Sequence, residues 1–218
     1  MRISKHIHSC LLIEESDTKI LVDPGGYSFG EDGEKPESFT GLSAIFITHN
    51  HPDHADPKAL KIILEQNPGA KVYGNSDTKD LLAKEGVPVE VFEDGEKQVG
   101  AISVAAYLVH HEKHLGIEPK NTAYIFNKVM LVTGDSYDGR LSQFKNIPIL
   151  ATPIMAPWAN QLQTAEFVKL IAPKIFLPIH DGFVKESAHQ WATTAFKAYL
   201  TDFDIEVRAL GPNEALEA

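Results

Sequence analysis

The sequence predicts a mixed α/β (α+β) fold in which two β-sheets are flanked by helices. Short apolar, β-branched runs of strand length recur along the 218 residues, and amphipathic segments with a helical period lie between them. These segments fall into two successive halves, a pattern typical of two sheets with helices on their outer faces. Because no internal repeat, low-complexity tract or linker interrupts them, we expect one domain over residues 1–218.

The amino-terminal half is predicted to contain strands separated by polar turns and two capped helices. Polar residues 15–17 separate the first two strands, and the Gly-rich stretch 27–40 is predicted to be a loop. Pro57 suits the first position of a helix, where no N–H partner is needed. Asn75 can cap a second helix, and Gly86 suits the position after its end. We expect strands at 2–14, 18–22, 42–48, 70–74 and 87–92, and helices at 58–66 and 78–85.

The carboxy-terminal half repeats these segment types after a polar turn at residues 93–95. Residues 127–128 join two strands into a hairpin. Two long segments with apolar residues at helical spacing are predicted to be helices. We expect strands at 102–109, 122–126, 129–132, 147–152, 175–179 and 205–210, and helices at 158–171 and 186–200.

Charge and composition exclude several kinds of partner. The net charge of −10, without a basic tract, argues against nucleic acid, because phosphate contacts require Lys and Arg. The single cysteine, Cys10, permits no intramolecular disulfide and fits a reducing compartment. No apolar leader opens the chain and no apolar run approaches ~20 residues, so we expect a cytoplasmic protein without a membrane partner. The sequence does not indicate an oligomeric state.

Four potential metal ligands lie within six residues, namely His49, His51, Asp53 and His54. Imidazole and carboxylate are preferred ligands of zinc and of its neighbours in the first transition row. The segment follows the predicted strand 42–48 and precedes a predicted helix, and open α/β sheets place their sites on such loops. Packing gains nothing from gathering four titratable groups, so the cluster predicts a metal site.

The segment 49–54 resembles the HxHxDH signature of the metallo-β-lactamase superfamily. Segments 8–14 and 20–25 are similar to the first hairpin of that superfamily, most of all in its small-hydrolase branch, which includes the ascorbate-phosphate lactonase. The resemblance extends over nearly the whole chain. It implies a four-layer αββα sandwich and metal-dependent hydrolysis.

Further ligand candidates follow three of the predicted strands, where side chains are held rigidly. His110 or His111 follows strand 102–109, Asp135 lies soon after strand 129–132, and His180 follows strand 175–179. The superfamily carries a third histidine, a bridging aspartate and a last histidine in this order. The resemblance therefore implies one ion held by His49, His51 and the third histidine, a second held by Asp53, His54 and His180, and Asp135 bridging both.

Only one of His110 and His111 can point into the site if the strand continues through both, because successive side chains face opposite ways. Counted from Val104, the superfamily's usual spacing reaches His111, which we favour as the ligand. His110 would then face the opposite layer, as a hydrogen-bonded or partly exposed side chain.

The resemblance implies a centre of two divalent transition-metal ions. Zinc is expected first, and manganese or iron are alternatives because all three accept nitrogen and oxygen ligands. A hydroxide bridging the ions would attack a small ester, lactone or phosphodiester, with Asp53 also orienting the nucleophile. The alternative is a metal-binding protein, a di-iron redox protein or a sensor on the same fold without hydrolysis. The sequence does not identify the substrate, for which we expect a small molecule.

The sequence leaves open the roles of three further side chains, namely His8, His114 and Asn121. His8 could orient a ligand or be a buried, hydrogen-bonded histidine. His114 and Asn121 lie on a polar loop and could touch substrate, although we expect surface positions for both. We interpret His6 and His189 as structural.

Overall fold

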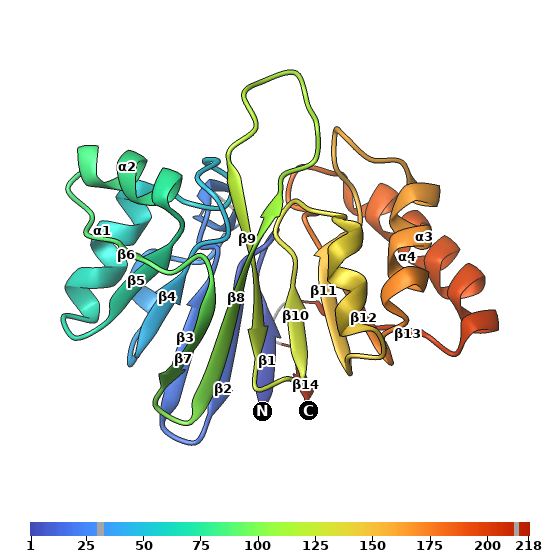
Figure 1. The fold of residues 1–218 in the computed structure, drawn as a ribbon, viewed down its shortest axis with the longest axis horizontal. Helices are drawn as coiled ribbons and strands as arrows, with labels where there is room; N and C mark the ends of the chain where they lie inside the picture. Colours follow the sequence, from blue (N-terminus) through green and yellow to red (C-terminus); the bar gives the residue numbers. More distant parts are fainter. Residues whose placement is uncertain (30–32, 212–213) are drawn as a thin grey trace.

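The fold is given by a computed structural model that describes residues 1–29, 33–211 and 214–218. In these ranges two seven-stranded sheets pack against each other (Figure 1). The strands of the first sheet are β1 (Arg2–Lys5), β2 (Leu11–Glu15), β3 (Thr18–Val22), β4 (Ala44–Phe46), β5 (Lys71–Gly74), β6 (Glu90–Val91) and β14 (Ala215–Glu217). Their order is β14-β1-β2-β3-β4-β5-β6.

The strand order of the second sheet is β13-β12-β11-β10-β9-β8-β7. Its strands are β7 (Gly95–Val99), β8 (Ile102–His110), β9 (Lys120–Phe126), β10 (Met130–Val132), β11 (Ile149–Pro153), β12 (Ile175–Ile179) and β13 (Glu206–Val207). Each sheet has an antiparallel part and a parallel part. The pairing changes from antiparallel to parallel at β3 in the first sheet and at β10 in the second. The parallel strands β4, β10 and β12 therefore end at the edge where an open sheet places its site.

Helices cover the outer face of each sheet. Figure 1 shows α1 (Pro57–Gln66) and α2 (Ser76–Lys84) beside β4 to β6, and α3 (Gln161–Ile171) and α4 (Glu186–Leu200) beside β11 to β13. Shorter 3₁₀ helices are η1 (Gly26–Phe29), η2 (Pro36–Ser38), η3 (Gly139–Phe144) and η4 (Thr201–Phe203). The layers run helix, sheet, sheet, helix, so the predicted αββα sandwich is confirmed.

Three apolar clusters hold the four layers together. Successive strand side chains point to opposite faces, so Phe46 packs between the sheets while its neighbour Ile45 packs under α1 and α2. In the second sheet, Val132 likewise packs between the sheets and Leu131 packs under α3 and α4. Both faces of the central strands are therefore buried, which explains their nearly continuous apolar sequence.

Several predicted elements agree closely with the structure. The strand 175–179 and the helix 186–200 have the predicted bounds. Helix α1 begins at Pro57, with Asp56 accepting hydrogen bonds from the first backbone N–H groups. Helix α2 is capped by the predicted Asn75. In the described ranges no helix combines the length and hydrophobicity of a membrane span.

Other predictions were wrong at element boundaries. The predicted strand 2–14 is two strands, because the chain reverses at residues 6–10 and pairs β1 with β2. The predicted helix 158–171 begins at Gln161, because Asn160 and Gln163 form a capping box there. Strands 87–92 and 205–210 shorten to the two-residue edge strands β6 and β13. The predicted loop 27–40 contains η1 and η2, and its residues 30–32 lie outside the described ranges.

Candidate metal centre

Two groups of potential metal ligands meet where β4, β8, β10 and β12 end. The ligand atoms of each group lie within 4.8 Å of one another. The first group is His49, His51, His111 and Asp135, and the second is His8, Asp53, His54 and His180. Segments far apart in sequence thus bring all seven predicted ligands together, and His8 joins them.

The carboxylate of Asp135 lies between the groups. Its Oδ1 is 3.2 Å from His54 Nε2, and its Oδ2 is 3.2 Å from His180 Nε2 and 3.7 Å from His111 Nε2. Gly134 allows this approach, because it has φ of 59° and a Cβ there would lie 2.3 Å from Asn121 Oδ1. Asn121 in turn accepts a hydrogen bond from the Asp135 N–H.

Three histidines turn their Nε2 atoms toward the centre, where a metal ion would take the place of a proton. Their Nδ1–H groups each donate to an oxygen: His54 to Asp23 Oδ2 at 2.8 Å, His111 to the Glu112 carbonyl at 2.6 Å and His180 to the Met155 carbonyl at 2.8 Å. Each Nε2 is buried and has no hydrogen-bond partner in the described part of the chain. Neutral imidazoles that donate through one nitrogen expose a lone pair on the other, which is how histidine binds metal.

His49 and His51 face each other across the first group. His49 Nε2 lies 3.2 Å from His51 Nδ1, and His49 Nδ1 lies 3.1 Å from Thr48 Oγ1. Since Thr48 Oγ1 donates its own proton to Asp23 at 2.7 Å, it can accept from His49 Nδ1–H. His49 Nε2 then carries a lone pair, which lies beside His51 Nδ1 and can bind a metal ion.

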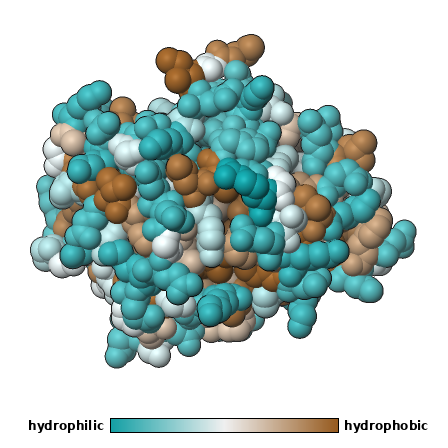
Figure 2. All heavy atoms as spheres, in the orientation of Figure 1, coloured by the Kyte–Doolittle hydropathy of each residue, from teal (hydrophilic) through white to brown (hydrophobic). Residues whose placement is uncertain are grey.

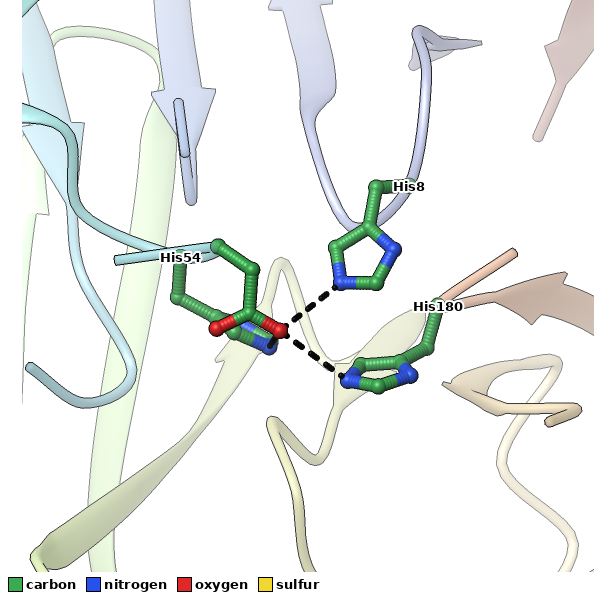
Figure 3. Close-up of side chains that lie close together, drawn as sticks. His8, His54 and His180 are labelled. Atoms are coloured by element: carbon green, nitrogen blue, oxygen red, sulfur yellow. Dashed lines mark hydrogen bonds and ion pairs between the residues drawn. The ribbon is translucent and has the colours of Figure 1, made fainter. Parts of the chain in front are cut away.

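His8 differs from the other histidines of its group. It lies in the turn 6–10 with φ of 66°, and the Gly182 N–H donates to its Nδ1 at 3.1 Å. The ring proton therefore sits on Nε2, which donates to Asp53 Oδ2 at 3.1 Å. Figure 3 shows His8, His54 and His180 turned toward one another, with dashed lines for the contacts of His8 and His180 with Asp53. His8 thus positions Asp53 and offers no lone pair.

The charges of the centre shift the pKa values of its members in opposite directions. Burial lowers the pKa of His49 well below its usual value and that of His51 to about 4. Burial also disfavours protonation of His54 and His180, but nearby Asp135 outweighs it and raises the pKa of His180 to about 9 and that of His54 as well. The pKa of Asp135 is held well below its usual range by the same two histidines, against the effect of burial. Metal cations would replace these protons beside the carboxylate.

The backbone under the signature segment is held by Asp23 and Gly25. Asp23 is fully buried and accepts hydrogen bonds from the backbone N–H and the hydroxyl of Thr48 as well as from His54. A Cβ on Gly25 would lie 1.8 Å from the Asp53 carbonyl oxygen, so only glycine fits there. The loop 49–54 is therefore supported from β3 and the turn after it.

The structure separates the two adjacent histidines at the end of β8. His111 is 3% exposed and lies in the first group, whereas the His110 side chain is 57% exposed and contacts Glu112 and Asp138. The expected surface position of Asn121 is wrong, because this side chain is fully buried and donates to the Thr133 carbonyl. His114 is half-buried, with its ring 5.1 Å from the rings of His51 and His111.

Sequence reasoning missed three supporting features. It assigned no role to Asp23, although an aspartate at a strand end was the available signal. It placed His8 within a strand rather than in a turn. It placed Trp158 at the start of a helix, whereas Trp158 lies before α3 and its indole Nε1–H donates to Asp135 Oδ2 at 3.2 Å.

An αββα sandwich with histidine and aspartate side chains gathered at its strand ends defines a class of metal-dependent enzymes. A family model described as a β-lactamase superfamily domain matches residues 2–180, a range that contains both groups. The chain therefore belongs to the metallo-β-lactamase superfamily, as its signature segment predicts.

Relatives with similar sequences cover most of the chain. The protein Rv0786c of Mycobacterium tuberculosis is 32% identical over 200 residues, which are 86% of this chain and 87% of that protein. A UPF0173 metal-dependent hydrolase of Aeropyrum pernix is 27% identical over 199 residues, which are 80% of each chain.

Solved structures show the same fold. Igni18, a metallo hydrolase of Ignicoccus hospitalis, matches with a TM-score of 0.70 at 19% identity over 99% of this chain and 97% of its own. The isothiocyanate hydrolase of Delia radicum gut bacteria matches with a TM-score of 0.70 at 14% identity over 100% of this chain and 99% of its own. These matches show the fold, whereas the family match and the named relatives show that the protein is a metal-dependent hydrolase.

Proposed function

We propose that the centre binds two divalent transition-metal ions, with zinc as first candidate, and hydrolyses a small ester, lactone or phosphodiester. The observation that carries this proposal is the convergence of buried, unpartnered ligand atoms on one space: Nε2 of His54, His111 and His180, and Oδ1 of Asp135. Buried polar atoms without partners are costly, and a bound cation satisfies all of them.

The two groups suggest how the ions would be shared. His49, His51 and His111 would hold one ion, and Asp53, His54 and His180 the other. Asp135 would bridge them, since its Oδ1 approaches His54 and its Oδ2 approaches His111. When bound, the ions polarise the substrate oxygen and lower the pKa of water toward ~7, which supplies a nucleophile at neutral pH.

Asp53 is the proposed catalytic carboxylate. Its side chain is 25% exposed, whereas that of Asp135 is 4% exposed, so Asp53 is the one of the two that can meet solvent and substrate. The hydrogen bond from His8 holds Asp53 Oδ2 in place. The pKa of Asp53 is lowered by His180 and His8 despite burial, so it remains an ionised acceptor that can orient the attacking water.

Metal analysis combined with an activity panel tests the proposal. Protein purified without chelator and reconstituted with zinc, manganese or iron should bind close to two equivalents, measured by mass spectrometry of the metals. The same samples should hydrolyse at least one aryl ester, lactone or phosphodiester, and chelation should abolish turnover. Two bound equivalents without any hydrolysis would instead favour a metal-binding or redox role, and a metal content near zero would contradict both.

A further inference from the structure

Fully exposed apolar side chains stand on a loop beside the metal centre. Figure 1 shows the loop between β8 and β9, residues 111–119, rising above the ends of both sheets, and Figure 2 shows apolar groups projecting at the top of the molecule in the same view. Leu115 and Ile117 on this loop are the most exposed large apolar side chains in the described part of the chain. Apolar side chains exposed beside a functional centre are available to contact a bound molecule.

The base of this loop is part of the centre itself. His111, its first residue, belongs to the first ligand group, and the ring of His114 lies 5.1 Å from the rings of both His111 and His51. Leu115 follows directly. The apolar part of the loop therefore begins one residue after a ring that borders the first ligand group.

A second apolar surface flanks the other ligand group. The ring of Tyr27 lies 5.0 Å from that of His8, and the ring of Phe183 lies 5.5 Å from that of His180. Tyr27 is 46% exposed and Phe183 is 42% exposed, and their rings are 6.2 Å apart. Large apolar side chains thus border both groups of ligands.

Lysine and arginine are absent from the inner contacts of the described part of the centre. Among the described residues no lysine or arginine forms an ion pair or hydrogen bond with any member of the two ligand groups; Lys5 pairs with Asp181 and Arg140 with Asp138. Sites that select phosphate groups usually supply such side chains, with Arg in bidentate contact. Apart from the metal ions themselves, the surroundings therefore supply no cation that would select an anionic group, and the apolar side chains beside them fit an apolar chain.

We propose that the substrate is a carboxylic ester or lactone carrying an apolar chain of at least about four carbons, which contacts Leu115 and Ile117 or Tyr27 and Phe183. This inference rests on the proposed hydrolytic function and names its substrate class. The reaction adds the oxygen of water to the acyl carbon and breaks the acyl C–O bond. The proton of the water goes to the leaving alcohol, so an acid and an alcohol form without any further reactant.

A chain-length series tests the proposed class. Zinc-loaded protein is compared on p-nitrophenyl butyrate, hexanoate and octanoate and on bis(p-nitrophenyl) phosphate. Each methylene buried against the apolar side chains should raise kcat/KM by about two- to four-fold. The phosphodiester should be the poorest substrate. A flat profile, or preference for the phosphodiester, overturns the inference while leaving the proposed hydrolysis intact.

Two serine double variants, called the rim variants, test whether the apolar side chains beside the ligand groups contact the substrate chain. Leu115→Ser with Ile117→Ser, or Tyr27→Ser with Phe183→Ser, should flatten the chain-length profile, depending on which side the chain contacts. Leu162→Ser with Leu170→Ser, on the exposed face of α3, is the matched control and should keep it. Lys113→Gln, which removes a charge from the loop, should also keep the slope. If neither rim variant changes the slope, the inference is wrong.

Binding without turnover gives an independent measurement. Titration of zinc-loaded protein with butyrate, hexanoate and octanoate should show Kd falling with chain length, and one of the rim variants should remove this trend. If no ester or phosphodiester is hydrolysed, the proposed function fails, but this trend still decides whether the centre recognises an apolar chain. If sedimentation shows that Leu115 and Ile117 instead hold two copies together, and Kd does not depend on chain length, the inference is overturned.

Discussion

Asp23 accepts a hydrogen bond from His54 Nδ1 at 2.8 Å, and both side chains are fully buried. Asp23 Oδ1 accepts from the Thr48 N–H at 2.7 Å, so one carboxylate fixes the ring of His54 and the start of the signature segment together. Such partners hold a ligand's tautomer and orientation, and their loss typically weakens metal binding by 10- to 100-fold.

Asp23→Asn should therefore lower metal affinity by about 10- to 100-fold with the fold retained. Asp23 accepts from three donors, the Thr48 N–H, the Thr48 hydroxyl and the His54 Nδ1–H. An amide has only one acceptor oxygen, so at least one of these donors loses its acceptor. Competition with a chromophoric chelator measures the affinity, and circular dichroism of the metal-free variant reports the fold. An unchanged affinity would show that His54 is oriented by its packing alone.

Asp135→Ala should weaken the binding of both ions and abolish turnover. The carboxylate lies between the two groups, within 3.7 Å of His54, His111 and His180, so no other side chain can replace it. Trp158→Phe is a less disruptive variant than Asp135→Ala, because it removes only the hydrogen bond to Asp135 Oδ2 and keeps an aromatic ring. We expect full metal content and a reduced kcat for Trp158→Phe. Full metal content and turnover in Asp135→Ala would make Asp135 a turn residue.

The adjacent histidines at the end of β8 provide a matched pair of variants. His111→Ala should lose one ion and nearly all turnover, because His111 is buried in the first group. His110→Ala should keep both ions, since its exposed side chain contacts only Glu112 and Asp138. The same metal and activity measurements apply to both. Loss of metal in His110→Ala alone would reverse the assignment.

Much of the site could be predicted because its residues are concentrated or follow readable strands. His49, His51, Asp53 and His54 lie within one short segment after an apolar run, and His180 follows an apolar strand whose bounds were predicted correctly. The period of two showed that only one of His110 and His111 can enter the site, and the superfamily's spacing selected His111. In the structure β8 continues through His110, and His111 is the buried one of the two.

The supporting residues could not be predicted in the same way. A buried aspartate such as Asp23 has the same sequence signature as an exposed turn aspartate, because only tertiary packing distinguishes them. The turn that carries His8 interrupts a run that alternates like a single strand. The edge strands β7 and β14 were missed, since β7 is polar on both faces and β14 is only three residues long.

Metal binding should strengthen as pH rises. In the metal-free protein Asp135 raises the pKa of His180 to about 9, so His180 is largely protonated at neutral pH, and it also raises the pKa of His54. A ligand must lose its proton to bind metal, so each bound proton that is displaced makes the apparent affinity rise by about ten-fold per pH unit below that pKa. Titrations at pH 6.5, 7.5 and 8.5, in buffers of different ionisation enthalpy, should show proton release and rising affinity.

The stability of the metal-free protein should follow the opposite trend. The folded pKa of His180, about 9, lies above its unfolded value of about 6.5, so protonation of His180 stabilises the fold. This contribution is fully present below pH 6.5 and is lost as pH rises through 9. Thermal unfolding of metal-free protein should show this loss between pH 6.5 and 9, whereas zinc-loaded protein should not, because the ion replaces the proton. Equal pH dependence with and without zinc would show that His180 does not bind the metal.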